Sequence, residues 1–431
     1  MAVKIVRQAN RIALLGAPTS AAALSAGHEG APAALRGAGL VDRLTSLGYQ
    51  VTDFGDDPAH TYQADDESPR ARNLRGVLAA LDALKPRVEQ AVKSCALPLI
   101  LSGDCSVALA TVAGARRYFR RVSMIYMDRD GDLNTPATTP SGSLDGMVVS
   151  HLTGRGAAEL VRFWPEPPLV RDPDLALFGV DRLDPSEEEA LRKFPLRSFP
   201  ADEIKRMGAG AAAQLALERV HAAGAEFVLH LDVDVIADFP ATNYPGSGGL
   251  TLEDVREALE VFAQAKNLAA LEVTAYNPPK DPEGAAAKTI VDLLAGALEK
   301  RLQTLSAAAA EPPSAESSTA AAAATGEDTT SAATVTASTG SDERPSSSSE
   351  ASAEAPAQER PEARRGESWS SEPESPEQPA GAEGDGAKRQ DETEAGASAA
   401  DFAAESSPSF ESSDAPSDPA EPSGSSGEPT N

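Results

Sequence analysis

Two short acidic runs supply most of the side chains in this sequence that could do chemistry. The runs, Asp128-Arg129-Asp130-Gly131-Asp132 and Asp232-Val233-Asp234, each end an apolar, strand-like segment. Alternate residues of an extended strand point the same way, so we expect the carboxylates of each run to share a face. Five carboxylates at one edge of a sheet repel each other strongly and need divalent metal or retained protons. The pattern therefore predicts metal-dependent hydrolysis.

Strand-like and helix-like segments alternate around these runs. Strands are expected at Ile12–Leu15, Val51–Phe54, Leu97–Leu101, Val122–Met127, Leu175–Val180, Phe227–Val233 and Leu268–Val273. Helices are expected at Ala33–Leu47, Leu74–Ser94, Val107–Phe119, Ser186–Phe194, Ala211–Ala223, Leu252–Lys266 and Ala285–Leu302. Such alternation predicts a three-layer α/β/α sandwich with a mostly parallel sheet, whose ligand site lies beyond the carboxyl ends of the strands.

Three finer predictions accompany this pattern. Pro86 should kink or split the helix that contains it, because proline removes a backbone donor and clashes with the preceding turn. The segment Pro240–Gly249, rich in Asn, Pro and Gly, reads as a loop, and Thr251 as the N-cap of the helix that follows it.

The composition divides the 431 residues into two parts. Residues 1–305 have enough apolar side chains for one large α/β domain. Residues 306–431 are mostly Ala, Ser, Glu, Pro, Gly and Thr, and we expect this tail to be disordered because it cannot bury enough apolar surface. The tail contains 26 acidic and 6 basic residues and carries 20 of the chain's 28 net negative charges, so the low pI says little about the fold.

Several classes of function are disfavoured. The acidic balance and the lack of a basic patch argue against nucleic acid as a partner. No apolar run is long enough to span a membrane, and the first residues lack a signal-peptide pattern. The two cysteines, Cys95 and Cys105, suit a reducing compartment better than a disulfide framework. We therefore expect a cytoplasmic protein that acts on a small-molecule substrate.

Roughly the first 300 residues resemble the arginase/agmatinase/formiminoglutamase (ureohydrolase) superfamily. The segments that carry the resemblance are Ser102-Gly103-Asp104-Cys105-Ser106, Asp128-Arg129-Asp130-Gly131-Asp132, Asn134-Thr135-Pro136, Ser141-Gly142-Ser143-Leu144-Asp145-Gly146-Met147, Asp232-Val233-Asp234 and Gly248-Gly249-Leu250-Thr251. They are similar, in order and spacing, to the family's Gly-Gly-Asp-His-Ser, Asp-Ala-His-x-Asp, Asn-Thr-Pro, Ser-Gly-Asn-x-His-Gly-Met, Asp-x-Asp and Gly-Gly-Leu-Thr motifs.

The resemblance implies a site with two Mn²⁺ ions that activate a bridging water. Asp128, Asp132, Asp232 and Asp234 stand at the family's four aspartate ligands, whereas its two histidine ligands are Cys105 and Asp130 here. An aspartate at 130 still suits Mn²⁺, whereas a thiolate at 105 favours Zn²⁺ or Fe²⁺, so one or two ions of any of these metals are expected per chain. The alternative for Cys105 is a small buried residue at a tight turn.

Other family positions imply roles in proton transfer and substrate binding. Asp145 replaces a histidine that shuttles protons, and it is either a general base with a raised pKa or a turn residue. Asn134, Ser141, Ser143 and Thr251 match substrate-binding positions, with loop or helix capping as the alternative for each. Ala275 stands where arginases have the glutamate that grips the guanidinium group. Ser143, where the family has asparagine, further weakens the case for L-arginine as the substrate.

The remaining polar residues near these motifs have less specific interpretations. His230 is either an outer partner of a metal ligand or, preferably, a core histidine bonded to a backbone group. His151 is read as a helix-surface residue, and His28 as solvent-facing. Arg129 should point away from the acidic face, toward the sheet interior or a neighbouring subunit.

Two functions follow from these observations. The first is a metal-dependent hydrolase of linear C–N bonds in guanidino or amidino compounds. The second is a catalytically inactive member of the same fold with a binding, assembly or regulatory role. The resemblance also implies a homo-oligomer, a trimer or a hexamer.

Overall fold

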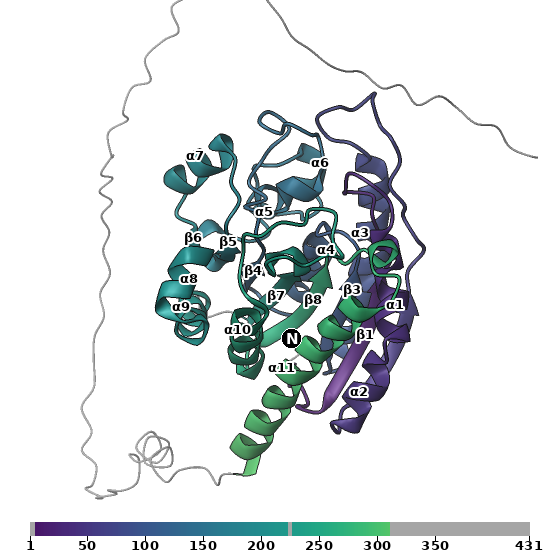
Figure 1. The fold of residues 1–431 in the computed structure, drawn as a ribbon, viewed down its shortest axis with the longest axis vertical. Helices are drawn as coiled ribbons and strands as arrows, with labels where there is room; N and C mark the ends of the chain where they lie inside the picture. The colour runs from purple at the N-terminus through teal and green to yellow at the C-terminus, as the bar shows by residue number, and fades with distance from the viewer. Residues whose placement is uncertain (1–4, 223–225, 311–431) are drawn as a thin grey trace, which may run out of the picture. The chain divides into compact units, whose positions relative to one another are not determined.

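The computed structural model describes residues 5–222 and 226–310 (Figure 1). Helix α11 (Ala285–Ala310) continues past the domain boundary expected at residue 305. The tail predicted to be disordered lies, from residue 311 onward, outside the described residues. Among the described helices, none is long and apolar enough to cross a membrane.

The described part of the chain is built on one sheet of eight parallel strands. The strands are β1 (Arg11–Ala17), β2 (Gln50–Asp56), β3 (Leu97–Ser102), β4 (Val122–Met127), β5 (Leu175–Val180), β6 (Arg197–Pro200), β7 (Glu226–Asp232) and β8 (Leu268–Thr274), in the order β2-β1-β3-β8-β7-β4-β5-β6. All seven expected strands are confirmed. The edge strand β6 was not expected, because its four residues carry no apolar alternation.

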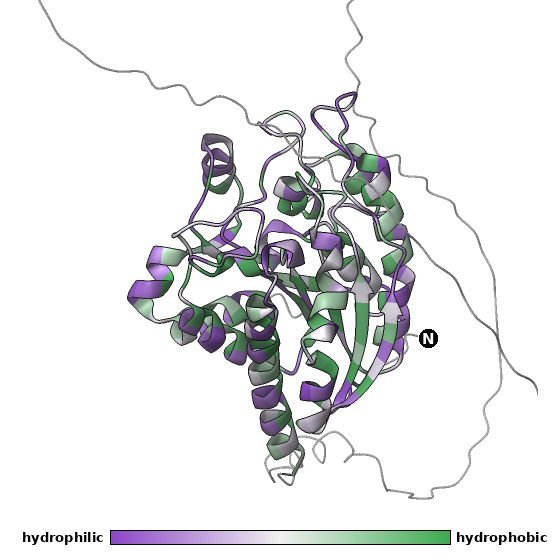
Figure 2. Ribbon diagram, turned by 45° about the vertical axis from the view of Figure 1, so that its right-hand side comes forward, coloured by the Kyte–Doolittle hydropathy of each residue, from purple (hydrophilic) through white to green (hydrophobic). Residues whose placement is uncertain are grey.

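Helices cover both faces of the sheet. One core packs against α1 (Ala31–Gly37), α2 (Leu40–Ser46), α8 (Ala201–Met207), α9 (Ala209–Ala222), α10 (Leu252–Gln264) and α11. The other packs against α3 (Leu74–Lys93), α4 (Val107–Arg116), α5 (Val148–Leu152), α6 (Ala158–Val161) and α7 (Pro185–Lys193). Short 3₁₀ turns lie at His28–Gly30, Asp145–Met147, Asp172–Asp174, Val233–Val235 and Pro278–Lys280. The predicted three-layer α/β/α sandwich is thus confirmed, and the ribbon in Figure 2, coloured by hydropathy, is mostly green (hydrophobic) along the central strands.

One predicted helix is divided into two, and another is not split at its proline. The helix expected over Ala33–Leu47 is divided into α1 and α2 at Gly39, which has a φ of 90° and therefore cannot continue the right-handed helix. Helix α3 runs from Leu74 to Lys93 without a break at Pro86. One face of α3 is buried against the sheet and α4, and this packing outweighs the lost backbone hydrogen bond.

The sheet order brings the motifs together. Strands β3, β8, β7 and β4 are neighbours at the centre of the sheet, and the segments after β3, β4 and β7 contain Cys105, Asp128 and Asp234. Parallel strands end at the same edge, so these residues meet although they are far apart in the chain. Thr251 caps α10 in a capping box with Asp254, and 240–249 is a loop, as predicted.

Candidate active site

A pocket of about 280 Å³ opens at the carboxyl edge of the central strands. The six predicted metal ligands all line it, together with the predicted proton-transfer residue: Cys105, Asp128, Asp130, Asp132, Asp232, Asp234 and Asp145. All of them except Asp130 are buried. The structure therefore brings together the acidic cluster that the two sequence runs predict.

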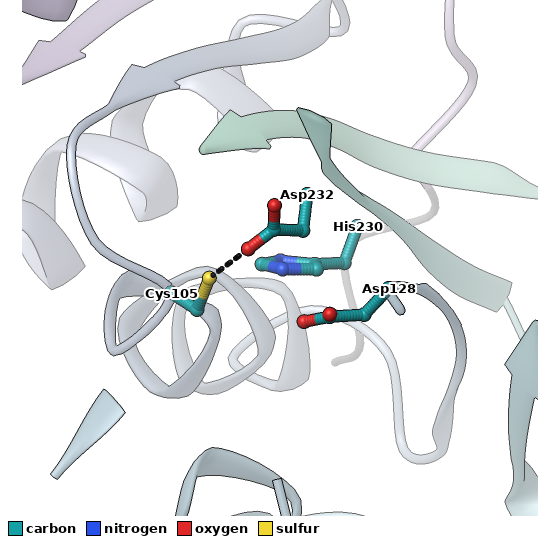
Figure 3. Close-up of side chains that lie close together, drawn as sticks. All are labelled: Cys105, Asp128, His230 and Asp232. Carbon is teal, nitrogen blue, oxygen red and sulfur yellow. Dashed lines mark hydrogen bonds between the residues drawn. The ribbon is translucent and has the colours of Figure 1, made fainter. Parts of the chain in front are cut away.

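The deepest part of the cluster is the inner group, Cys105, Asp128, His230 and Asp232, shown in Figure 3. One potential ligand atom from each residue lies within 4.8 Å of the others. The Cys105 thiol donates to Asp232 Oδ2 at 3.0 Å and lies 3.2 Å from Thr274 Oγ1. The inner group thus combines sulfur, nitrogen and carboxylate donors from the carboxyl ends of β3, β4 and β7.

His230 belongs to a row of side chains that runs across three strands. Tyr126 of β4, His230 of β7 and Glu272 of β8 are register partners. The imidazole stacks on the Tyr126 ring, with centroids 4.1 Å apart, and its Nδ1 lies 2.7 Å from Glu272 Oε1. The preferred prediction is confirmed in that His230 lies in the core, but it was wrong about the partner, because Nδ1 pairs with a buried carboxyl group and not with a backbone group. A carboxyl group on one ring nitrogen is a typical support for a histidine whose other nitrogen binds metal.

A second set of ligand atoms within 4.8 Å of one another is the outer group, Asp128, Asp130 and Asp234. Arg182 donates from Nε and Nη2 to both carboxylate oxygens of Asp130, and its Nη2 lies 3.5 Å from Asp234 Oδ2. Arg129 lies 3.9 Å from Asp234 Oδ2 and donates to the backbone oxygen of Tyr244. The prediction that Arg129 points away from the acidic face was wrong, because its guanidinium lies beside Asp234, where it bonds to the backbone of the loop that contains Tyr244.

Asp132 lines the pocket outside both groups. Its backbone has a φ of 48°, and its carboxylate accepts a hydrogen bond from the Tyr126 hydroxyl. A buried neutral donor is thus aimed at this carboxylate. The hydrogen bond uses Oδ2, so it does not by itself prevent Asp132 from binding an ion through its other oxygen.

Burial and mutual repulsion raise the pKa of the buried carboxyl groups. For Asp128 and Asp232 burial is the main cause, and neighbouring carboxylates raise the pKa further. The same two causes raise the pKa of the Cys105 thiol and bring that of Asp234 to about 6. Without a bound cation the cluster therefore holds protons near neutral pH, and a divalent ion that binds there must release them.

Asp145 lies against the inner group. Its Oδ1 accepts the backbone N–H of Cys105 at 2.8 Å. Burial, and then the charge of Asp104, raise the pKa of Asp145 to about 8. A carboxyl group with a pKa near neutrality can both give and take a proton at that pH, which is what a general acid–base group requires.

Three of the four predicted substrate-binding residues line the pocket. Asn134 donates to Asp184 Oδ2 at 2.7 Å, Ser143 donates to the backbone oxygen of Ala22 at 2.7 Å, and Ser141 is the third lining residue of this set. Thr251 is the N-cap of α10 and is not among the lining residues. For Thr251 the structure thus favours helix capping, the alternative interpretation.

Among the lining residues that sequence reasoning missed, four have charged or phenolic side chains: Arg182, Asp184, Glu187 and Tyr244. Asp184 and Glu187 form the capping box of α7, and burial raises the pKa of Glu187 to about 7. Arg182, Asp184 and Glu187 follow β5 directly, so the rule that sites lie beyond strand ends could have identified them. Tyr244 comes from an irregular loop, and no sequence signal places it there.

Two histidines predicted to face solvent are buried instead. His28 and His151 have buried side chains, and burial lowers their pKa values to about 4 and about 3 respectively. Both predictions were wrong because the loop and the short helix that contain them are covered by neighbouring segments. Ala275, in the position of the arginase glutamate, has a φ of 64° and is also buried.

The donors of the inner group fit a divalent metal ion. The group offers a thiol, an imidazole and two carboxyl groups, a mixture typical of Zn²⁺ and Fe²⁺ sites. The outer group fits an ion less well, because guanidinium groups already contact its carboxylates. The inner group is therefore the better candidate for a metal site.

The fold and site define an α/β protein with a parallel sheet and a buried cluster of potential metal ligands at its carboxyl edge. The arginase family model matches residues 10–298. The chain is 30% identical to arginase from Bacillus caldovelox over 295 residues, which cover 68% of this chain and 99% of that protein. It is also 30% identical to arginase from Bacillus subtilis over 292 residues, 68% of this chain and 98% of that protein. The solved structure of the Bacillus caldovelox arginase matches with a TM-score of 0.62 at 29% identity and covers 67% of this chain and 98% of that chain. The chain belongs to the arginase family.

Proposed function

We propose that this protein is a divalent-metal-dependent hydrolase of linear C–N bonds in guanidino or amidino small molecules. The observation that carries the proposal is the buried cluster of carboxylates around Cys105 and His230, at the edge of the sheet where a parallel α/β fold binds its ligands. Family membership supports the same reaction class.

The inner group would hold the ion, through Cys105, Asp128, His230 and Asp232. An ion bound there supplies the nucleophile by lowering the pKa of a coordinated water. Glu272 would orient the imidazole through its 2.7 Å contact with His230 Nδ1. The surrounding strands exclude bulk water from these side chains, which strengthens every charge interaction in the site.

Asp145 would move the protons. The water loses a proton and the departing nitrogen gains one, and a carboxyl group with a pKa of about 8 can perform both steps. Asp184, Glu187, Asn134 and Ser141 line the pocket and would bind the rest of the substrate. Carboxyl groups among them favour a cationic substrate. Since Ala275 offers no carboxylate, we expect a substrate other than L-arginine or a slow reaction with it.

The test combines metal analysis with a hydrolysis screen. The full chain is stripped with a chelator, refilled separately with Mn²⁺, Zn²⁺ or Fe²⁺, and dialysed before elemental analysis. Each loaded form is then screened against guanidino and amidino compounds for release of urea, ammonia or an amide. Asp128→Ala and Asp232→Ala should each lose both metal and activity, whereas the control Asp202→Ala, exposed on α8, should keep both. Wild-type protein that retains no metal would contradict the proposal.

The second candidate is a catalytically inactive family member with a binding, assembly or regulatory role. The observation that favours it is the arginine pairing in the outer group, together with Ala275. Bound metal without hydrolysis of any compound in the screen would select this candidate. Assembly into trimers or hexamers stays a prediction, which light scattering of the full chain would test.

A further inference from the structure

Backbone hydrogen bonds hold Arg182 beside the outer group. The N–H groups of Asp181 and Arg182 both donate to the backbone oxygen of Arg129, at 2.9 and 3.0 Å, and Asp130 and Arg182 form an isolated parallel bridge. The side chain therefore starts beside Asp130 and needs only its own length to reach the carboxylate. The backbone pairing that follows the ends of β4 and β5 therefore sets the position of Arg182.

The contact with Asp130 uses the geometry in which arginine binds carboxylates best. Two parallel N–H groups, on Nε and Nη2, engage the two oxygens of Asp130, and Nη2 also approaches Asp234. The planar guanidinium stays charged at all accessible pH values, and a bidentate contact is stronger and more specific than a single hydrogen bond. Both oxygens of Asp130 therefore already accept a hydrogen bond from a guanidinium, and an ion would have to compete with that positive charge.

Arg129 adds a second positive charge beside the same group. Its side chain is 4% exposed, and it lies 3.9 Å from the Asp234 carboxylate, which is 2% exposed. An ion bound to Asp128, Asp130 and Asp234 would have to displace the Arg182 guanidinium and remain beside that of Arg129. Arg129 and Asp234 are buried there and screened weakly, whereas the side chains of Asp130 and Arg182 are 26% and 44% exposed. The inner group differs in this respect: among residues 5–222 and 226–310, no arginine forms an ion pair with Asp128 or Asp232.

We propose that each chain holds one divalent ion, in the inner group, and that the Arg182 guanidinium is the permanent second cation of the site. This inference rests on the proposed function, because it assumes that the inner group binds metal. It also explains how Asp130 is accommodated: a carboxylate adds negative charge to the outer group, and Arg182 supplies the matching positive charge from within the chain.

The experiment counts ions per chain. Full-length wild type, Arg182→Gln, Arg182→Lys and the control Arg192→Gln are stripped, loaded with Mn²⁺ or Zn²⁺, and dialysed so that ions held weakly by surface acids are removed. Arg192 is exposed on α7 and pairs only with Glu188 among the ion pairs described. We expect one ion per chain in wild type, Arg182→Lys and Arg192→Gln, and two in Arg182→Gln, where the outer carboxylates are released.

Each outcome decides between the two proposals. Two ions in wild type, or a single ion in a folded Arg182→Gln variant, would overturn the role of Arg182 and leave the proposed function standing. No ion in wild type would instead reject the proposed function itself. If Arg182→Gln does not fold, electron paramagnetic resonance of Mn²⁺-loaded wild type replaces it. The resolved hyperfine pattern of an isolated ion supports the inference, and the broadened spectrum of a spin-coupled pair contradicts it.

Discussion

Asp145 should make the metal-free protein less stable as the pH rises. Its pKa is raised from 3.8 to about 8, mainly by burial and then by the charge of Asp104. A carboxyl group whose pKa is raised on folding stabilises the native state below its unfolded pKa, and this stability is lost as the pH rises toward the folded pKa. The window for Asp145 is therefore from about pH 4 to about pH 8.

The magnitude follows from the size of the shift. Each unit of pH inside the window costs about 1.4 kcal/mol, so the contribution of Asp145 falls by about 3–4 kcal/mol between pH 5 and pH 8. Asp145→Asn removes this titration and keeps an oxygen that accepts the Cys105 N–H. The variant should gain about 3–4 kcal/mol relative to wild type over that pH interval.

The assay is urea unfolding of chelator-treated protein at both pH values. Subtracting the variant from wild type cancels the titration of the buried histidines, which changes stability in the opposite direction. Asp292→Asn, exposed on α11, is the control and should show no such difference. The reasoning is refuted if the difference between wild type and Asp145→Asn is the same at pH 5 and pH 8. Saturating divalent metal should reverse the wild-type trend, because the ion binds the deprotonated carboxylates.

Three further substitutions test other parts of the structure. His151→Leu should raise the free energy of unfolding by about 2 kcal/mol near pH 5. Burial lowers the histidine pKa from 6.5 to about 3, so the wild type loses stability as the pH drops through that window. An unchanged midpoint in acid unfolding would contradict the burial of His151. Gly103→Ala should disrupt the turn after β3, since its Cβ would lie 1.9 Å from a backbone oxygen. Gly296→Ala, with no atom within 4 Å, should instead raise the free energy of unfolding by about 0.5–1 kcal/mol. Equal melting temperatures for the two variants would refute the clash. Glu272→Leu should lower the free energy of unfolding in urea by about 3 kcal/mol or more, because it leaves the His230 Nδ1 buried without a partner. Glu272→Gln keeps an acceptor and should cost about 1 kcal/mol. Similar losses in the two variants would show that the hydrogen bond is unimportant.

Much of the fold was predictable because its signals are local. The apolar runs that became β3, β4 and β5 are buried along their whole length, and their spacing alone requires helical crossovers between parallel strands. The two acidic runs end strands of one parallel sheet, so their meeting at one edge followed from topology. Thr251 was also recognisable as a helix cap, since capping depends on residues only three positions apart.

The predictions failed where a side chain's partner is distant in sequence. His28 and His151 look like ordinary loop and helix residues, and only the packing of other segments over them shows that they are buried. The same holds for His230, whose sequence neighbours do not reveal that β8 places Glu272 beside it. Burial and pairing of single polar residues are set by long-range contacts, which periodicity cannot report.

The sequence by itself determined the layered fold, the parallel sheet and the identity of the acidic cluster, because strand and helix periods and the i, i+2 spacing of aspartates are local properties. Only the tertiary structure decided how the cluster is divided. The register between β4 and β7 places His230 near Asp128. The pairing just after the ends of β4 and β5 places Arg182 beside Asp130, 52 residues away in the chain. The protonation of a buried carboxyl group depends on its burial and on the charges packed beside it, and the packing of the strands sets both.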